Sequence, residues 1–476
     1  MLRLADVITG TQMLPSQLCT ALYRYLRHQW RWLIMMGLAT SWTMGLGTTA
    51  TADYTRYASP EAAPQPVITR GIGVEARIQA IEQTWEADYT AFLRSPSGLQ
   101  PLDGADVAAT LAELNTQTGH RLGLVYIVPE SDGLELVLAS PDAAAVQYRL
   151  EVPRSRFEAE VDNLQRQILR PNSDRYLAPA QQLYQWLIAP MEADLGDRRI
   201  DTLVFCVGER VRSLPLAALH DGQQFLAEKY DLGLIPALTL TDPQFRALRQ
   251  VDVLAMGASE FNRLADLPAV SVELSTVADE LWPGVIHLNA DFTKQVLQRE
   301  LAQAQYEIVH LATHAEFQEG AADQSFIQLW QDEQLNLLEL RDLDWQTLPV
   351  ELLVLSACQT ALGNPQAELG FAGLAYQTGV RSALASLWSV SDVGTLALMR
   401  EFYGQLAQAQ GETKAAVLGS TQRAMIHGEV TLTETQLVNS SGQAIALPLS
   451  LQAQVADIDL SHPFYWSAFV LVGAPW

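Results

Sequence analysis

A histidine and a cysteine follow two apolar segments at equivalent positions. Residues 306–313 (YEIVHLAT) end just before His314, and residues 351–357 (ELLVLSA) end just before Cys358. A thiol with a pKa of about 8.5 is mostly protonated at neutral pH, whereas a thiolate beside an imidazolium is a competent nucleophile. The imidazole would later protonate a leaving amine. Brought together, these two side chains predict nucleophilic catalysis at a carbonyl carbon.

The elements that must position these side chains are strands of a parallel sheet. From about residue 175, continuous apolar segments alternate with segments of helical periodicity, which predicts an α/β fold with a mainly parallel sheet and helices on both faces. The expected strands are 201–207, 251–258, 306–313, 351–357, 381–390 and 465–473, and the expected helices are 272–282, 293–304, 371–379, 395–409 and 414–426.

One helix-sized connection, residues 334–345 (QLNLLELRDLDW), lies between the third and fourth of these strands. A right-handed crossover would place the two strands side by side or nearly so, with neighbouring strands about 4.8 Å apart. Reactive groups of such sheets gather beyond the carboxyl ends of the strands, so His314 and Cys358 would face one crevice. The backbone N–H groups of Ala315 and Cys358 are then candidates for an oxyanion hole.

Five separate segments resemble the signature segments of the CHAT family, peptidase-like domains of the caspase clan. They are residues 212–243 (RSLPLAALHDGQQFLAEKYDLGLIPALTLTDP), HLATHAEF, LSACQTALG, GLAYQTGVRSALASLWSVSD and HPFYWSAFVLVG. The resemblance covers about residues 175–476. It implies a caspase-like fold, a dyad of His314 and Cys358, and cleavage of a protein or peptide substrate through an acyl-thioester intermediate. It implies neither a cofactor nor a metal. Proteases of this clan are commonly latent until cleavage or partner binding orders their loops, so an activating protein partner is one of the two expected routes to activity.

The sequence departs from the clan's pattern at two positions. Ala315 replaces the glycine that usually follows the catalytic histidine, and Ser356 stands where relatives carry a glutamine or an aspartate that shapes specificity. The substrate preference of those relatives is therefore not expected to hold for this protein. The candidate substrate-binding residues are Ser356, Trp388, Ser389 and Asp392. Asp392 is alternatively the N-cap of a helix that begins at Val393.

His310 and Cys206, which also lie in these apolar segments, are expected to have structural roles. His310 and His314 form an H-x-x-x-H pair, but the segment is strand-like and no glutamate follows the first histidine, which argues against zinc. His310 is expected to be a packed strand residue, and Cys206 a small apolar residue of the strand at 201–207.

The alternative function of the protein is a catalytically silent caspase-like scaffold that recruits partners.

The residues before 175 are expected to form three parts. Arginines followed by a short apolar segment and an A-x-A pattern ending at Ala52 predict that residues 1–52 are a signal peptide or a membrane anchor. Residues 53–69 read as a linker, and residues 70–172 as a small α+β unit that precedes the domain at 175–476. Export to the periplasm or the exterior is therefore expected, with the cytoplasm as the alternative. A membrane is a partner only if the leader stays uncleaved.

Composition limits the classes of partner. Asp and Glu outnumber Lys and Arg by 54 to 30, and the basic residues are scattered, so nucleic acid is an unexpected partner. With 49% apolar and 18% charged residues, the chain has enough apolar sequence for a large packed core. Only three cysteines, Cys19, Cys206 and Cys358, are present, which gives no disulfide framework. Residues 429–460 break the strand–helix alternation and are expected to be an insertion.

Overall fold

The structure is a computed structural model of the chain. It describes residues 64–93, 102–208, 210–249, 251–303, 305–316, 324–343, 345, 348–356, 375, 378–409, 411–456 and 458–476. Cys358, the expected leader at 1–52 and most of the expected helix at 371–379 lie outside the described residues.

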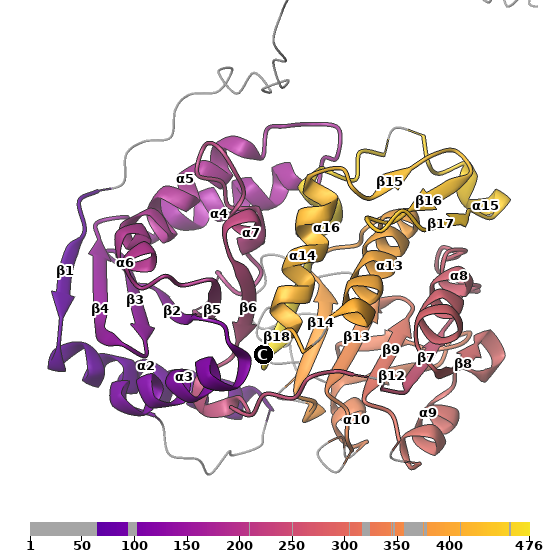
Figure 1. The fold of residues 1–476 in the computed structure, drawn as a ribbon, viewed down its shortest axis with the longest axis horizontal. Coiled ribbons are helices and arrows are strands. Elements are labelled where there is room, and N and C mark those ends of the chain that lie inside the picture. Colours follow the sequence, from indigo (N-terminus) through magenta and orange to yellow (C-terminus); the bar gives the residue numbers. More distant parts are fainter. Residues whose placement is uncertain are drawn as a thin grey trace, which may run out of the picture. The chain divides into compact units, whose positions relative to one another are not determined.

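Twelve strands of the described residues form one sheet (Figure 1). In spatial order they are β1 (Val67–Arg70), β4 (Ala143–Leu150), β3 (Leu134–Ser140), β2 (Leu122–Pro129), β5 (Thr202–Val207), β6 (Asp231–Ile235), β18 (Phe469–Gly473), β14 (Ser382–Ser386), β13 (Leu352–Ser356), β9 (Ile308–Ala312), β7 (Val253–Gly257) and β8 (Gly284–Leu288). All six expected strands are present.

The sheet contains two parallel blocks that run in opposite directions. Strands β2, β5, β6 and β18 are parallel to one another, and so are β14, β13, β9, β7 and β8. The blocks meet where β14 pairs antiparallel with β18. Every residue of β9, β13 and β14 is buried, which requires cover on both faces of these strands. The mainly parallel α/β sheet predicted from the sequence is confirmed.

Long helices follow the apolar periodicity of the sequence. In the C-terminal half, α13 (Asp392–Gln408) packs against α14 (Lys414–Ile426), and α14 also contacts β6 and β18 (Figure 1). The other α-helices described after residue 175 are shorter: α5 (Leu177–Leu187), α6 (Glu192–Asp197), α7 (Leu226–Lys229), α8 (Val270–Ser275), α9 (Lys294–Leu301), α10 (Leu337–Arg341), α15 (Leu449–Gln452) and α16 (Pro463–Trp466). A π-helical turn, Thr276–Leu281, continues α8.

The N-terminal region contributes α2 (Ile72–Leu93), α3 (Gly104–Thr118) and α4 (Arg154–Ile168) around the antiparallel strands β1 to β4. Helix α3 ends at Gly119, whose φ of 78° is a left-handed conformation that favours glycine. Because β2 pairs in parallel with β5, the expected units at 70–172 and 175–476 share one continuous sheet. The buried Glu82 of α2 also accepts hydrogen bonds from the N–H groups of Leu238 and Thr239. These two regions therefore have a common core.

The connection between β9 and β13 differs from the expected helix. It contains a small antiparallel sheet of β10 (Ala315–Glu316), β11 (Phe326–Gln328) and β12 (Gln334–Asn336), and only then the five-residue helix α10. The side chain of Asn336 accepts a hydrogen bond of 2.9 Å from the N–H of Glu339, so the helix begins after Asn336. The first three residues of the predicted helix therefore form a strand instead.

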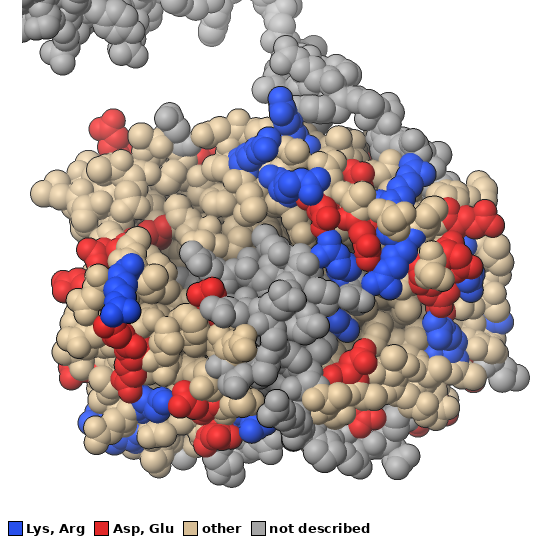
Figure 2. Space-filling view, turned by 180° about the vertical axis from the view of Figure 1, so that it is seen from behind, with Lys and Arg blue, Asp and Glu red and all other residues tan. Residues whose placement is uncertain are grey.

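The expected insertion at 429–460 forms a second small sheet of β15 (Thr431–Leu432), β16 (Gln436–Val438) and β17 (Ala444–Ala446), followed by α15. Figure 2 shows one face of the molecule, on which many Lys and Arg side chains lie beside Asp and Glu side chains.

Among the described residues, no helix is both long enough and apolar enough to span a bilayer.

Candidate active site

The strands that lead to the two candidate catalytic residues are direct neighbours. Strands β9 and β13 are parallel, and Ala312 at the end of one pairs with Ser356 at the end of the other. His314 follows Ala312 by two residues, and Cys358 follows Ser356 by two residues in the sequence. The expected adjacency of these strands is confirmed, although Cys358 itself lies outside the described residues.

The imidazole of His314 is oriented by two contacts. Its Nε2 atom lies 2.8 Å from the carbonyl oxygen of Ala265, and the ring of Phe261 meets it edge-on with 4.7 Å between the ring centres. A carbonyl oxygen only accepts hydrogen bonds, so Nε2 must carry the proton. In the neutral ring the lone pair is therefore on Nδ1, which makes Nδ1 the basic atom of this histidine.

The carbonyl of Ala265 belongs to the loop that follows β7, and this loop has its own hydrogen bonds. The N–H of Leu267 donates to the carbonyl of Ser259 at 2.9 Å, and the N–H of Phe261 donates to the carboxylate of Asp266 at 3.1 Å. At its base, the N–H of Ser259 donates to Asn289 at 2.8 Å. The loop thus has a defined conformation that presents both contacts to His314.

The N–H group of Ala315 points away from the small sheet. The N–H of Gln328 donates to the carbonyl of His314 at 2.8 Å, which makes these two residues a hydrogen-bonded pair of the antiparallel ladder. Ala315 and Ile327 form the next, non-hydrogen-bonded pair, so the N–H and C=O of Ala315 are directed away from β11. The methyl group of Ala315 is buried. The donor is therefore oriented toward a partner outside the small sheet.

A comparison with protein families matches the CHAT domain over residues 177–474. This chain belongs to the CHAT domain family. A comparison with curated protein sequences finds no match. The family and the observed sheet together identify the fold as caspase-like.

Three solved structures are similar to this CHAT protein at low identity. The Saccharomyces cerevisiae separase–securin complex matches with a TM-score of 0.43 and 9% identity, over 77% of this chain and 31% of that one. Gingipain R, an Arg-specific cysteine proteinase, matches with a TM-score of 0.39 and 11% identity, over 67% and 75%. The complex of the pro- and mature domains of Porphyromonas gingivalis RgpB has a TM-score of 0.40 and 11% identity, over 75% and 78%.

Of the candidate substrate-binding residues of the CHAT domain, Ser356 and Trp388 are buried, and both side chains have internal partners. The hydroxyl of Ser356 donates to the carboxylate of Glu273, and the Nε1–H of Trp388 donates to the carbonyl of Phe464 at 3.0 Å. Ser389, in contrast, is exposed. Substrate contacts by these three residues stay predictions.

Asp392 is the first residue of α13, and the N-cap is Ser391, whose hydroxyl accepts a hydrogen bond of 3.1 Å from the N–H of Gly394. The alternative that Asp392 caps a helix beginning at Val393 is therefore wrong. The carboxylate of Asp392 instead accepts a hydrogen bond of 2.7 Å from the N–H of Ala269. Burial, together with the nearby charge of Glu273, raises the pKa of Asp392 to about 7.

Sequence reasoning missed a buried polar chain beneath the site. His310 is fully buried, as expected, but its Nε2 lies 2.9 Å from the carboxylate of Glu273 on α8, and its Nδ1 lies 3.0 Å from the hydroxyl of Tyr403 on α13. Burial, and then the charge of Glu273, raise the pKa of Tyr403 well above its usual value, so this hydroxyl stays protonated and donates to Nδ1. The same carboxylate also accepts from Ser356. These hydrogen-bonded side chains thus connect β9 and β13 with helices α8 and α13.

A cavity of about 430 Å³ lies beside His314. The loop after β7 forms part of its lining through Phe261, Arg263, Leu264 and Ala265. The small sheet of β10 to β12 contributes Glu316, Phe326, Gln328 and Gln334, and the turn between β11 and β12 contributes Gln331 and Asp332. Ser356, Trp388, Ser389 and Asp392 are not among the described residues that line it.

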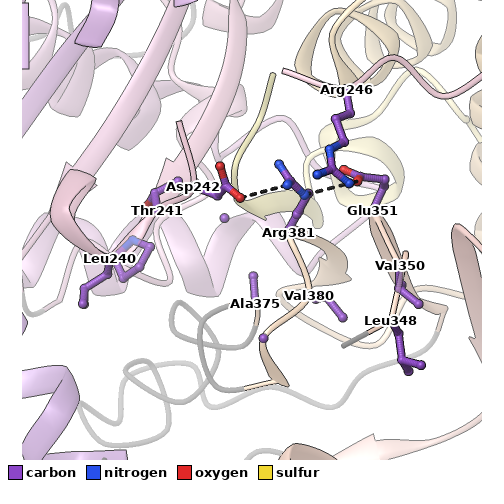
Figure 3. A pocket seen from close by; sticks show the side chains of 13 residues that line it. Leu240, Thr241, Asp242, Arg246, Leu348, Val350, Glu351, Ala375, Val380 and Arg381 are labelled. Atoms are coloured by element: carbon purple, nitrogen blue, oxygen red, sulfur yellow. Dashed lines mark hydrogen bonds and ion pairs between the residues drawn. The ribbon is translucent and has the colours of Figure 1, made fainter. Parts of the chain in front are cut away.

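A second cavity, of about 360 Å³, is lined by residues near the starts of β13 and β14 and is shown in Figure 3. There Arg381 lies between two carboxylates, 2.9 Å from Asp242 and 3.2 Å from Glu351, and Arg246 also lies 3.2 Å from Glu351. Burial raises the pKa of Glu351. Asp242 and Arg246 come from the segment after β6, so these ion pairs join the two blocks of the sheet at the strand ends opposite to His314.

Proposed function

We propose that this CHAT protein is a cysteine endopeptidase in which His314 is the general base and acid and Cys358 is the nucleophile. The observation that carries the proposal is the pairing of Ala312 with Ser356, from which the two residues follow at equal sequence distance. The basic Nδ1 atom of His314 and the outward N–H of Ala315 add the proton acceptor and one oxyanion donor that such a reaction needs.

In the proposed reaction, Nδ1 of His314 takes the proton of the Cys358 thiol, and the thiolate attacks the carbonyl carbon of the scissile peptide bond. The N–H groups of Ala315 and Cys358 stabilise the oxyanion. When the tetrahedral intermediate collapses, Nδ1–H gives its proton to the leaving amine and the acyl-thioester remains. Water then attacks the thioester, its proton passes to Nδ1, and the thiolate leaves and is reprotonated. Throughout, the Nε2–H bond to Ala265 keeps the ring in place.

The substrate in this proposal is a protein or peptide, and an activating protein partner is part of it. The proposal also keeps the export of the chain, directed by residues 1–52, as expected from the sequence. N-terminal sequencing of the mature protein from its host tests export, because cleavage after Ala52 would place residue 53 first.

Labelling with a library of peptidyl electrophiles tests the activity. Wild-type protein should be labelled at Cys358, and labelling should be absent in Cys358→Ala and slower by about 10²- to 10⁴-fold in His314→Ala. Cys206→Ala is the matched control, since Cys206 is fully buried and its pKa is raised well above the usual value by burial. A wild type that stays unlabelled across the library, even with host cell extract added, would favour the scaffold function instead.

A further inference from the structure

We propose that the cavity beside His314 is the subsite for the residue that follows the scissile bond, and that it takes a lysine or arginine side chain. This inference rests on the proposed peptidase function and names the substrate class of that same site. The cavity is defined by described residues of the loop after β7 and of the small sheet β10 to β12.

The strand order places the cavity on the leaving-group side. Strand β9, which leads to His314, lies between β13, which leads to Cys358, and β7, whose following loop lines the cavity. The cavity is therefore on the side of His314 that faces away from the strand leading to the nucleophile. In peptide cleavage the general acid protonates the leaving amine. The part of the substrate that begins with this amine must consequently lie next to the imidazole, where the cavity opens.

The register of the small sheet explains why its polar face forms one wall. Glu316 pairs with Phe326, and Gln328 pairs with Gln334, so these four side chains project from the same face as His314. All four line the cavity. The opposite face carries the buried side chains of Ala315, Ile327 and Leu335, of which Ala315 also borders the cavity. Core packing thus fixes which face of the small sheet is turned to the cavity.

The lining fits a long side chain with a cationic end. Phe261, Leu264 and Phe326 offer apolar surface for an aliphatic stem, and Leu264 is 45% exposed. Glu316 and Asp332 offer carboxylates for an ammonium or guanidinium group. Besides the catalytic His314, the cation among the described lining residues is Arg263, whose side chain is 82% exposed and lies 3.7 Å from Asp332. A cationic substrate side chain can displace Arg263 from this long, exposed contact. A substrate carboxylate would instead be repelled by Glu316 and Asp332.

The test measures how the acyl-enzyme partitions between hydrolysis by water and acyl transfer to added amines. Wild-type protein acylated by an activated ester is offered glycine amide, lysine amide and glutamate amide as acceptors, and the acyl-transfer products are quantified. Lysine amide should be the best acceptor and glutamate amide the worst. Peptide substrates that differ only in the residue after the scissile bond should show the same order in kcat/KM.

Three variants make the test specific to the cavity. Glu316→Gln should lower the ratio of lysine to glycine transfer by about fivefold, the effect of losing one partly exposed ion pair. Arg263→Ala should change the ratio in the opposite direction, because it removes the competing cation. Glu434→Gln, an exposed acid in the insertion, is the matched control and should leave the ratio unchanged.

The outcomes separate this inference from the proposed function. If Cys358 is labelled and peptides are cut, but the ratio is the same in wild type, Glu316→Gln and Arg263→Ala, the subsite assignment is wrong and the peptidase stands. If no acyl-enzyme forms at Cys358, both fail. A preference for lysine that survives Glu316→Gln and Arg263→Ala unchanged would place its recognition elsewhere.

Discussion

A carboxylate oxygen of Glu273 lies 2.9 Å from Nε2 of His310 in the interior of the molecule, where the two side chains are only 2% and 0% exposed. Glu273 lies on α8 and His310 on β9, and the same carboxylate accepts a hydrogen bond from Ser356 at the end of β13. One buried carboxylate therefore connects the middle of β9, through His310, with the end of β13, through Ser356. Its loss should affect stability and the site together.

Replacing Glu273 by alanine should lower the free energy of unfolding by about 2–5 kcal/mol, because the buried donors of His310 and Ser356 lose their acceptor. Urea unfolding measures the change. Asp279→Ala removes an exposed acid from the following π-helical turn and should stay within about 0.5 kcal/mol of the wild type. A loss of less than 1 kcal/mol in Glu273→Ala would show that this contact is not stabilising.

Arg381 and Arg246 should differ in their contributions to stability, although both lie 3.2 Å from Glu351. The Arg381 side chain is 15% exposed and also contacts Asp242, whereas the Arg246 side chain is 53% exposed. Arg381→Ala should cost about 3–5 kcal/mol and Arg246→Ala at most about 1 kcal/mol, as is typical of buried and exposed pairs. Thermal unfolding of the two variants compares them, and equal losses would contradict the expectation.

Asp392 should make stability fall as the pH rises from about 4 to about 7. Its pKa is raised from 3.8 to about 7 in the folded chain by burial and by Glu273, so the folded state holds a proton that the unfolded state has already released in this range. The asparagine of Asp392→Asn can still accept from Ala269 but does not titrate. Urea unfolding midpoints between pH 4.5 and 8 should therefore slope less in this variant; an unchanged slope would exclude Asp392 as the titrating group.

His120 should stabilise the folded chain most at low pH. Its hydrogen bond to Asp201 is the main reason why its pKa is raised to about 9, and Glu412 adds a contact at 3.2 Å. The stabilisation is fully present below about 6.5 and is lost as the pH rises through 9. His120→Gln should thus be less stable than the wild type at pH 6 and equally stable near pH 10. A difference that is constant with pH would assign the effect to packing.

How much of the fold was predictable depended on how continuous the apolar pattern of each element is. Four strands of the second block, β7, β9, β13 and β14, and the helices at 395–409 and 414–426 follow continuous apolar or periodic patterns and were predicted, whereas β8 was missed. Strand β6 was missed because it contains Gly233, which weakens a strand pattern and is required where a Cβ atom would overlap the ring of Pro475. The small sheet β10 to β12 was not predicted because its strands have only two or three residues, and its last strand, β12, lies in the segment that was expected to be a helix.

For the site, the sequence identified residues but not their partners. His314 could be proposed from its place after a strand, yet its contact with Ala265 lies 49 residues away along the chain. Glu273 appeared as one acid within a predicted helix, and its pairing with His310 arises only when α8 packs on the sheet. Contacts between distant segments have no local pattern that a single sequence could reveal.

The position of β18 has a consequence for biosynthesis. This strand lies between β6 and β14 in the middle of the sheet, yet residues 469–473 are the last of its strands to be translated. The two parallel blocks cannot be joined by β18 while those residues are still inside the ribosome. We therefore expect nascent chains to emerge with an open seam at the centre of the sheet, and the emergence of residues 469–473 to be the event that closes it.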